Sequence, residues 1–139
     1  MPDVEEAENK ARCLKMVASW NRWKVEGITR YWAPGVVHYS QDRVVDSATM
    51  VGLMEEGLRA FPDLHLEVKS IMAEGDRVIL RITVTATHTG EFQGVPPTGR
   101  RVSWYLVEEL RFADGQVVEH WDVINHLPML ERIGQVSAA

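Results

Sequence analysis

The hydrophobic positions in the first part of the chain recur at the spacing of an α-helix. Within residues 4–26 the apolar side chains come mostly three or four residues apart with charged residues between them; they are Ala7, Ala11, Leu14, Ala18 and Trp20. This spacing gathers them on one face and predicts an amphipathic helix that ends at Gly27. Residues 28–32 favour a further turn of helix, and residues 36–40 a short strand.

The middle of the chain changes from a helical period to a period of two. A second helix is predicted over residues 47–60, with Ser47 as its N-cap and Pro62 after its end. Four later segments alternate apolar and polar residues, which is typical of strands with one wet face: residues 64–69, 78–88, 102–112 and 117–124. A turn at residues 74–76, a Gly- and Pro-rich loop at 90–99 and the Asp114-Gly115 hairpin signal separate them. Residues 127–133 favour a last turn of helix.

Helices that precede a strand meander predict an α+β domain. The helices must pack on one face of the sheet, and long strands bent around them leave a concave side, where an apolar ligand pocket is expected. We therefore expect a strongly curved antiparallel or mixed sheet wrapped around the N-terminal helices. With 139 residues, 45% of them hydrophobic, and with neither linker nor repeat, the chain is expected to form a single domain over residues 1–139.

Charge and cysteine usage narrow the expected partners and location. The net charge of −5 with no basic run argues against nucleic acid or an anionic membrane surface as the main partner. No apolar stretch approaches the roughly 20 residues of a membrane span. Cys13 is the single cysteine, so an internal disulfide is excluded and a reducing, cytoplasmic location is the simplest expectation.

The motifs that the chain lacks narrow the chemistry. It contains no Gly-rich phosphate loop, no G-x-S-x-G elbow, no H-E-x-x-H motif and no dinucleotide fingerprint. Its five histidines are scattered and lack the close helical spacing typical of a metal pair. An enzyme built on this chain is therefore expected to need neither metal nor cofactor and to use acid–base chemistry in a dry pocket.

Two polar residues interrupt the apolar faces of the predicted strands. Glu108 lies in the row that Trp104, Leu106, Leu110 and Phe112 form. A carboxylate there is costly unless it is paired, protonated or in contact with a wet cavity; a bulge or strand end that turns it outward is an equally good interpretation. His88 ends the apolar row of its strand, where a histidine is more often a satisfied wall residue than a catalyst.

The last predicted strand carries the pair His120 and Asp122, which share a face with Val118 and Ile124. Both faces of this strand are mixed, so alternation alone leaves open which one looks inward. If Asp122 does face the cavity, Glu108 lies near it on the neighbouring strand. Two carboxylates in a low-dielectric site raise the pKa of one of them, and such a group accepts a proton from carbon near neutral pH.

The five tryptophans allow two interpretations. Most of them are expected to fill the core. Trp32 and Trp104 lie where a helix or strand could look into the concave side, so we take these two as candidate walls for a flat aromatic ligand.

Several stretches resemble the SnoaL-like family, small polyketide cyclases with the cone fold of nuclear transport factor 2. The resemblance runs over residues 61–134 and includes Phe61-Pro62-Asp63-Leu64 and Thr87-His88-Thr89-Gly90. Its most specific part is Gly94-Val95-Pro96-Pro97-Thr98-Gly99-Arg100. The resemblance implies a cone-shaped, homo-oligomeric domain that acts on small aromatic polyketide intermediates, and a dimer is expected from the Thr-rich stretch at residues 81–87.

The resemblance also implies roles for individual residues. In the cyclases a carboxylate two residues after a histidine in the last strand is the acid/base of an intramolecular aldol closure; Asp122 matches it, after His120. The histidine before the Gly-Pro-Pro loop matches His88. A second pocket histidine falls on Glu108 here, and Asn125 stands where many members have aspartate. Both departures leave the fold unchanged but set the aldol reaction in question, and similar relatives take part in hydroxylation instead.

The sequence leads to three hypotheses for function. The first is cofactor-free aldol ring closure of an anthracycline-type polyketide, with Asp122 as base and the enolate held by His88 or Asn125. The second is hydroxylation of a similar substrate with molecular oxygen, and the third is a non-catalytic pocket protein that carries a ligand. The remaining candidates for binding substrate, besides the two tryptophans and Asn125, are Arg101 and His38.

Overall fold

The computed structural model describes residues 3–137, so the single domain expected over residues 1–139 includes four terminal residues outside the described part. The chain forms four helices and six strands in these residues. The helices are α1 (Val4–Trp20), α2 (Glu26–Thr29), α3 (Ser47–Ala60) and α4 (Leu127–Ile133). The strands are β1 (Trp32–Ser40), β2 (Arg43–Val45), β3 (His65–Glu74), β4 (Arg77–Thr87), β5 (Arg101–Ala113) and β6 (Gln116–Asn125).

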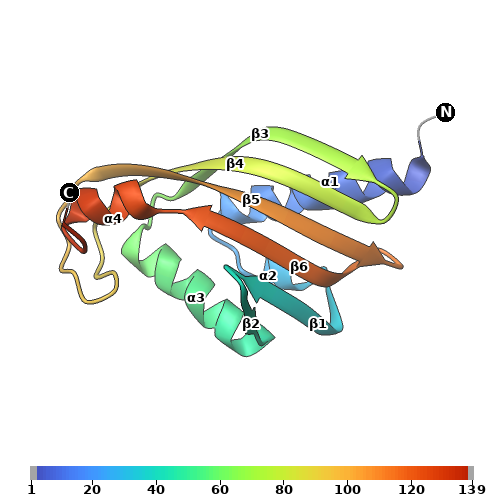
Figure 1. Ribbon diagram of the computed structural model, residues 1–139, viewed down its shortest axis with the longest axis horizontal. Helices are drawn as coiled ribbons and strands as arrows, with labels where there is room; N and C mark the ends of the chain where they lie inside the picture. Colours follow the sequence, from blue (N-terminus) through green and yellow to red (C-terminus); the bar gives the residue numbers. More distant parts are fainter. Residues whose placement is uncertain (1–2, 138–139) are drawn as a thin grey trace.

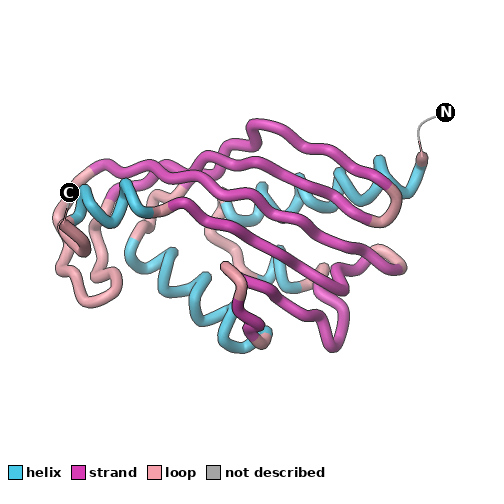
Figure 2. Tube along the Cα trace, in the orientation of Figure 1, coloured by secondary structure: helices cyan, strands magenta, loops and turns pink. Residues whose placement is uncertain are grey.

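The six strands form one curved, mixed sheet in the order β2-β1-β6-β5-β4-β3 (Figure 1). Neighbouring strands are antiparallel except β1 and β6, which run parallel. Helix α1 packs on β3 and β4, α3 packs against β1, and α4 packs against β5. Figure 2 shows the long loop between β4 and β5 at the end of the sheet where α4 lies. The expected α+β class with a curved sheet around helices is confirmed.

The inner row of β4 forms the centre of the core. Val78, Leu80, Ile82, Val84 and Ala86 are all buried, whereas the residues between them are exposed or half-buried. This alternation is the one that the sequence predicts, because successive side chains of a strand point to opposite faces. The hydrophobic rows of β3 and β5 meet the same core from the neighbouring positions.

The first helix is shorter than its hydrophobic pattern predicts, because it ends at Trp20 and not near Glu26. Asn21 forms two hydrogen bonds with Leu66 of β3: its amide donates to the Leu66 carbonyl at 3.0 Å and its side-chain oxygen accepts from the Leu66 N–H at 2.7 Å. The Trp23 indole N–H donates to the Leu64 carbonyl at 3.0 Å. These bonds pair backbone groups on the edge of the sheet and draw the chain out of the helix.

Further differences from the sequence expectations concern the segment before α3. The N-cap of α3 is Asp46 and not Ser47, because the Asp46 side chain accepts a hydrogen bond from the Thr49 N–H at 2.7 Å. The short strand expected at residues 36–40 is the end of β1, which begins at Trp32, and β2 follows it as an unexpected edge strand. The turn of helix expected at residues 28–32 corresponds to α2, which begins at Glu26 and ends at Thr29.

An irregularity in β6 decides which of its side chains face the core. Arg111 pairs with Glu119, but the next residue, Phe112, pairs with Val117, so Val118 is an extra residue in the ladder. Val117 is therefore buried on the same side as His120 and Asp122 although its number has the opposite parity. The simple alternation that the sequence analysis assumed ends at this bulge.

The outer face of the sheet exposes more apolar surface than the Thr-rich stretch of β4 suggested. Met72, Ile79, Tyr105, Val107 and Val123 are large hydrophobic residues exposed there. Strand pairing places Met72 beside Ile79 and Val107 beside Val123, and exposed apolar residues grouped in this way often mark an interaction site. The homo-oligomer stays a prediction, but the apolar residues of β3 to β6 replace residues 81–87 as the surface that motivates it.

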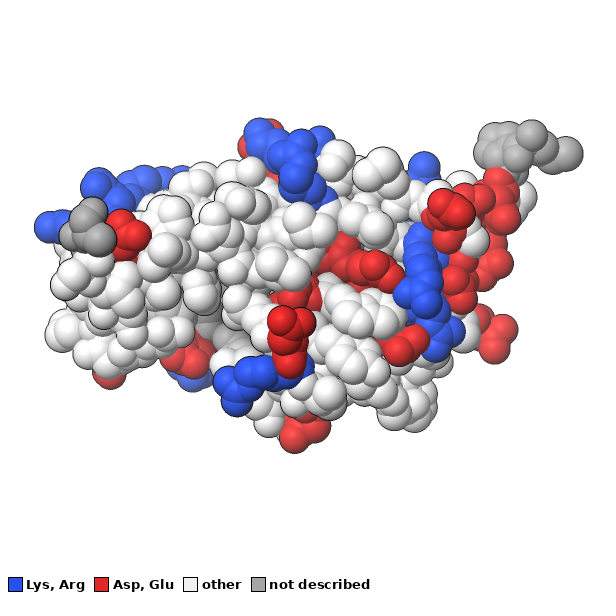
Figure 3. Space-filling view, viewed as in Figure 1, with Lys and Arg blue, Asp and Glu red and all other residues white. Residues whose placement is uncertain are grey.

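The charged side chains are unevenly distributed on the face drawn in Figure 3. Acidic side chains gather near the end that carries the N-terminus, with one group of Lys or Arg side chains beside them, and the other Lys and Arg side chains are scattered along the edges and at the opposite end. Within residues 3–137, no helix is both long and apolar enough to cross a membrane.

Gly90 provides a test of how closely the β4–β5 loop packs on α3. Its N–H donates to the Ala60 carbonyl at 3.0 Å, and a Cβ at this position would collide with the backbone of Arg59 and Ala60. We expect Gly90→Ala to lower the free energy of unfolding by about 1–3 kcal/mol, as other overpacked sites do. Urea denaturation measures this change.

The matched control is Gly52→Ala in the exposed middle of α3, where nothing lies within 4 Å of the added Cβ. Alanine is the better helix former, so this variant should gain roughly 0.5–1 kcal/mol. Equal effects of the two substitutions would contradict the close packing at Gly90.

Candidate active site

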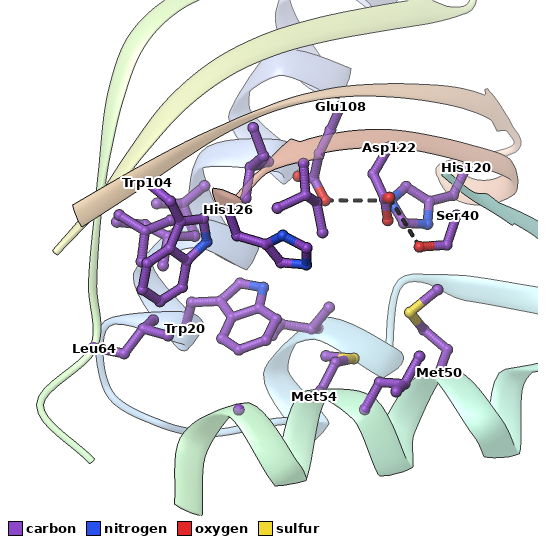
Figure 4. Close-up of a pocket in the computed structure, with 18 of the residues that line it drawn as sticks. Trp20, Ser40, Met50, Met54, Leu64, Trp104, Glu108, His120, Asp122 and His126 are labelled. Carbon is purple, nitrogen blue, oxygen red and sulfur yellow. Dashed lines mark hydrogen bonds and ion pairs between the residues drawn. The ribbon is translucent and has the colours of Figure 1, made fainter. Parts of the chain in front are cut away.

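The concave side of the sheet and helices α1 and α3 enclose a cavity of about 300 Å³. Most of its lining is apolar, and its walls include Met16, Trp20, Met50, Met54, Leu64 and Trp104. The polar side chains Ser40, Glu108, His120 and Asp122 gather at one end, and Trp104 and Leu64 lie at the other (Figure 4). An apolar pocket with a few convergent polar groups is the usual form of a small-molecule site.

Strand pairing brings the polar cluster together. Glu108 on β5 lies directly opposite Asp122 on β6, and Ser40 on β1 lies opposite the same aspartate from the other side. The His120 Nε2 is 3.2 Å from the Glu108 Oε1 and 3.7 Å from the Asp122 Oδ2. The Ser40 hydroxyl donates to the Asp122 Oδ1 at 2.9 Å. Three adjacent strands thus position two carboxylates around one imidazole.

Burial raises the pKa of Asp122 above its ordinary value, because the pocket disfavours the charged carboxylate. The negative charge of Glu108 raises it further, whereas the His120 imidazole and the Ser40 hydroxyl oppose the shift. Asp122 is 8% exposed and lines the pocket, so its proton affinity is increased at a place that a ligand can reach.

For His120 the neighbouring carboxylates, and not burial, decide the direction of the pKa shift. Burial disfavours its imidazolium, but the hydrogen bond to Glu108 and the charges of Glu108 and Asp122 outweigh burial, so the pKa of His120 is raised. The cluster therefore holds a carboxylate that binds protons more readily and an imidazole that keeps its proton to higher pH. Such a set is suited to general acid–base chemistry.

The two tryptophans expected as walls both line the cavity. Trp32 packs edge-on against His38 with ring centroids 4.4 Å apart, and Trp104 packs against Phe61 with centroids 5.1 Å apart. Their contacts with buried rings fix their orientation, so they offer rigid aromatic surface to a flat ligand.

The SnoaL-like polyketide cyclase family model matches residues 11–133, which is most of the chain. The chain belongs to this family. The match extends the resemblance from the second half of the chain into α1. It places the whole pocket, from Cys13 on α1 to Met129 on α4, inside the family domain.

Three relatives show the range of sequence identity between this chain and known proteins of the SnoaL-like type. The structure of AclR, a candidate hydroxylase from Streptomyces galilaeus, is 69% identical, with a TM-score of 0.93 over 96% of this chain and 85% of that chain. IdmH, a candidate polyketide cyclase from Streptomyces antibioticus, is 27% identical, with a TM-score of 0.81 over 91% of this chain and 98% of that one. The aklanonic acid methyl ester cyclase AcmA of Streptomyces galilaeus is 25% identical over 93% of this chain and 92% of its own length.

Four of the residues proposed from the sequence of this SnoaL-like protein lie outside the pocket lining. His88 is fully buried beside Phe61, where its Nδ1 lies 2.9 Å from the Thr98 hydroxyl and holds the β4–β5 loop. Arg101 is exposed and binds Asp63 at 3.0 Å. These contacts give both residues structural roles, and the expectations that His88 is catalytic and that Arg101 binds substrate stay predictions that their placement outside the pocket lining does not support.

The other two residues lie on the wrong side of a strand or behind another residue. Asn125 pairs with the exposed Tyr105 on the outer face of the sheet, because it is three residues beyond Asp122. His38 is fully buried behind His120, and Trp32 covers its ring. The expected substrate-binding roles of Asn125 and His38, and the enolate-holding roles of His88 and Asn125, stay predictions that these positions outside the pocket lining do not support.

The structure adds pocket residues that the sequence analysis missed. Ser40, Gln93 and His126 line the cavity with polar groups, and burial lowers the pKa of His126. Ser40 is 82 positions from Asp122 and meets it only through the parallel β1–β6 pairing, which the local pattern does not signal. Within residues 3–137, no group of three or more His, Cys, Asp or Glu side chains is arranged to hold a metal ion.

The coupling between Glu108 and His120 is open to direct measurement. Glu108→Gln removes the negative charge that favours the imidazolium, so we expect the pKa of His120 to fall. Proton NMR of the His120 ring during a pH titration measures the shift. Glu109→Gln is the matched control, because Glu109 is on the outer face and binds Arg77; a change of similar size in both variants would contradict the assignment.

Proposed function

We propose that this protein is an enzyme of aromatic polyketide biosynthesis, in which Asp122 removes a proton from a substrate carbon that carbonyl groups flank. The observation that carries the proposal is the position of Asp122: it is buried, its pKa is raised, and it lines an apolar, tryptophan-walled pocket. The family, whose model describes polyketide cyclases, supports an anthracycline-type substrate.

The proposed step needs no metal and no bound cofactor. A carbon between carbonyls is already acidic, so a carboxylate with increased proton affinity suffices as its base. The proton moves to Asp122, and the electron pair of the broken C–H bond enters the adjacent carbonyl to give an enolate. His120 and His126 are the imidazoles that line the pocket, and we assign stabilisation of the enolate to the positive charge of His120 and to a hydrogen bond from His126.

Hydroxylation is the fate of the enolate that we place first. AclR is 69% identical and is described as a candidate hydroxylase, whereas the named cyclases are 23–25% identical. In this reaction the carbanion adds molecular oxygen, one oxygen atom stays on carbon and the other leaves as water. The balance requires two electrons and two protons, so an external reductant, such as a separate reductase acting on a quinone substrate, must supply the electrons.

Intramolecular aldol closure is the second candidate, and the names of four curated cyclases favour it. The enolate then attacks a second carbonyl carbon of the same molecule. The new alkoxide takes a proton back from Asp122, so no electrons and no net protons are exchanged. Both reactions therefore begin with the same proton transfer and differ in what the enolate meets.

Asp122→Asn tests the assignment of the catalytic base. The amide cannot accept the substrate proton, so we expect turnover to fall by about 10²–10⁴-fold, the range that general base catalysis supplies. Product formation is measured by chromatography, and circular dichroism shows that the variant is folded.

Asp114→Asn is the matched control, because Asp114 is in the β5–β6 turn at φ 51°, a conformation that asparagine tolerates. It should keep its activity. Nearly full turnover of Asp122→Asn would overturn the assignment of the base.

A further prediction separates hydroxylation from aldol closure. With an anthraquinone polyketide and a chemical or enzymatic reductant, we expect one molecule of oxygen to be consumed for each molecule of product, measured with an oxygen electrode. Conversion of aklanonic acid methyl ester under anaerobic conditions, without reductant, would instead show ring closure and overturn the hydroxylase assignment. That outcome would leave the role of Asp122 intact.

A further inference from the structure

His38 is a fully buried histidine behind the polar cluster that the proposed mechanism leaves without a role. It lies directly opposite His120 in the parallel pairing of β1 with β6. Its Nδ1 is 3.1 Å from the Nδ1 of His120, and its Nε2 is 3.2 Å from the Ser47 hydroxyl. Both ring nitrogens of His38 are therefore in hydrogen bonds, and the bonds connect the pocket cluster to the start of α3.

The chain of hydrogen bonds ends at the outside of the molecule. Ser47 is half-buried and lines a shallow surface hollow between α2 and α3, together with Glu26 and Glu55. Ser47 is not among the residues that line the active-site pocket. The Trp32 ring, which lines the pocket, packs edge-on against His38, whereas His38 and Ser47 are both outside the pocket lining, so the path runs behind that lining.

The hydrogen-bond roles along this chain depend on the charge of His120. The Nε2 of His120 is 3.2 Å from the Glu108 Oε1, and toward a carboxylate, which only accepts hydrogen bonds, this nitrogen is the one that carries a proton. In neutral His120 the Nδ1 is then bare, and His38 must donate from its own Nδ1 and accept from Ser47 at Nε2. In protonated His120 the Nδ1 donates instead, so His38 must accept at Nδ1 and donate from Nε2 to Ser47.

We propose that His38 is a proton relay that exchanges protons between His120 and solvent at Ser47 while substrate fills the pocket. The inference rests on the proposed function, because it concerns how protons reach and leave the buried acid–base cluster during turnover. When His120 gives up a proton, its Nδ1–H moves to the Nδ1 of His38, the Nε2–H of His38 moves to the Ser47 oxygen, and the Ser47 hydroxyl proton passes to water. Protons needed for oxygen reduction enter by the reverse sequence.

The surroundings of His38 keep it neutral, as a relay through tautomers requires. Burial and the neighbouring His120 lower the pKa of His38 to about 4, and Asp46 at the start of α3 opposes this shift only in part. The charged groups around the pair are Glu108 on β5 and Asp122 on β6, both of which face His120 rather than His38. The shared charge therefore resides on His120, and His38 changes only the nitrogen that carries its proton.

The relay is tested first in the ligand-free wild-type protein, which makes the result independent of any substrate. Nitrogen-15 NMR of labelled histidine distinguishes protonated from bare ring nitrogens during a pH titration. We expect the proton of His38 to move from Nε2 to Nδ1 over the pH range in which His120 loses its charge. A single unchanging tautomer of His38, or a charged His38 in that range, would overturn the proposal.

Two variants then separate a relay from a residue that merely positions His120. The amide of His38→Asn can hold His120 by one hydrogen bond but cannot pass a proton, so we expect about 10²-fold slower turnover. His38→Ala should be equally slow and should recover with added imidazole, in proportion to the neutral form of imidazole. Full activity of His38→Asn, or no recovery of a folded His38→Ala, would contradict the relay.

The controls keep this inference distinct from the proposed function. His65→Ala, at an exposed position on β3, should keep wild-type turnover and should not respond to imidazole. If the wild-type protein converts neither an anthraquinone polyketide nor aklanonic acid methyl ester, the proposed function fails. The NMR titration still decides whether the two histidines exchange a proton in concert.

Discussion

The parallel pairing of β1 with β6 is the constraint on which the site depends. It aligns Ser40 with Asp122 and His38 with His120, and the antiparallel neighbour β5 then brings Glu108 to the same place. Because these contacts are set by backbone register, the side chains need little freedom to meet. A shift of β1 by one residue would turn both of its polar side chains to the outer face and leave the buried carboxylate without a hydroxyl partner.

The sequence predicts well whatever depends on local periodicity. The inner rows of β3, β4 and β5, the limits of α4 and the place of Glu108 beside Asp122 follow from alternation and from strands that are consecutive in the chain. The same alternation places Trp104 on the inner face, whereas Trp32, expected in a turn of helix, is the first residue of β1. The substrate-binding roles given to Arg101 and Asn125 rested on residue type more than on position, and the fold places both outside the cavity.

The features that the sequence did not predict depend on contacts between distant segments. Ser40 and His38 acquire their partners from a strand about eighty residues later. The bulge at Val118 is invisible to a simple period-two analysis, although it decides which parity of β6 faces inward. The early end of α1 has the same kind of cause, since Asn21 leaves the helix to bond an edge strand 45 positions away. In each case a long-range backbone partner outweighs the local preference.

The two walls of the cavity differ in stiffness. On the sheet side Trp104 is held by Phe61, whereas α1 and α3 present Met16, Met50 and Met54, whose unbranched thioether chains change shape at little energetic cost. The cavity therefore has a rigid aromatic surface on one side and an adaptable thioether surface on the other. Shortening or branching these methionines therefore changes the shape of the adaptable wall without altering the carboxylate end of the cavity.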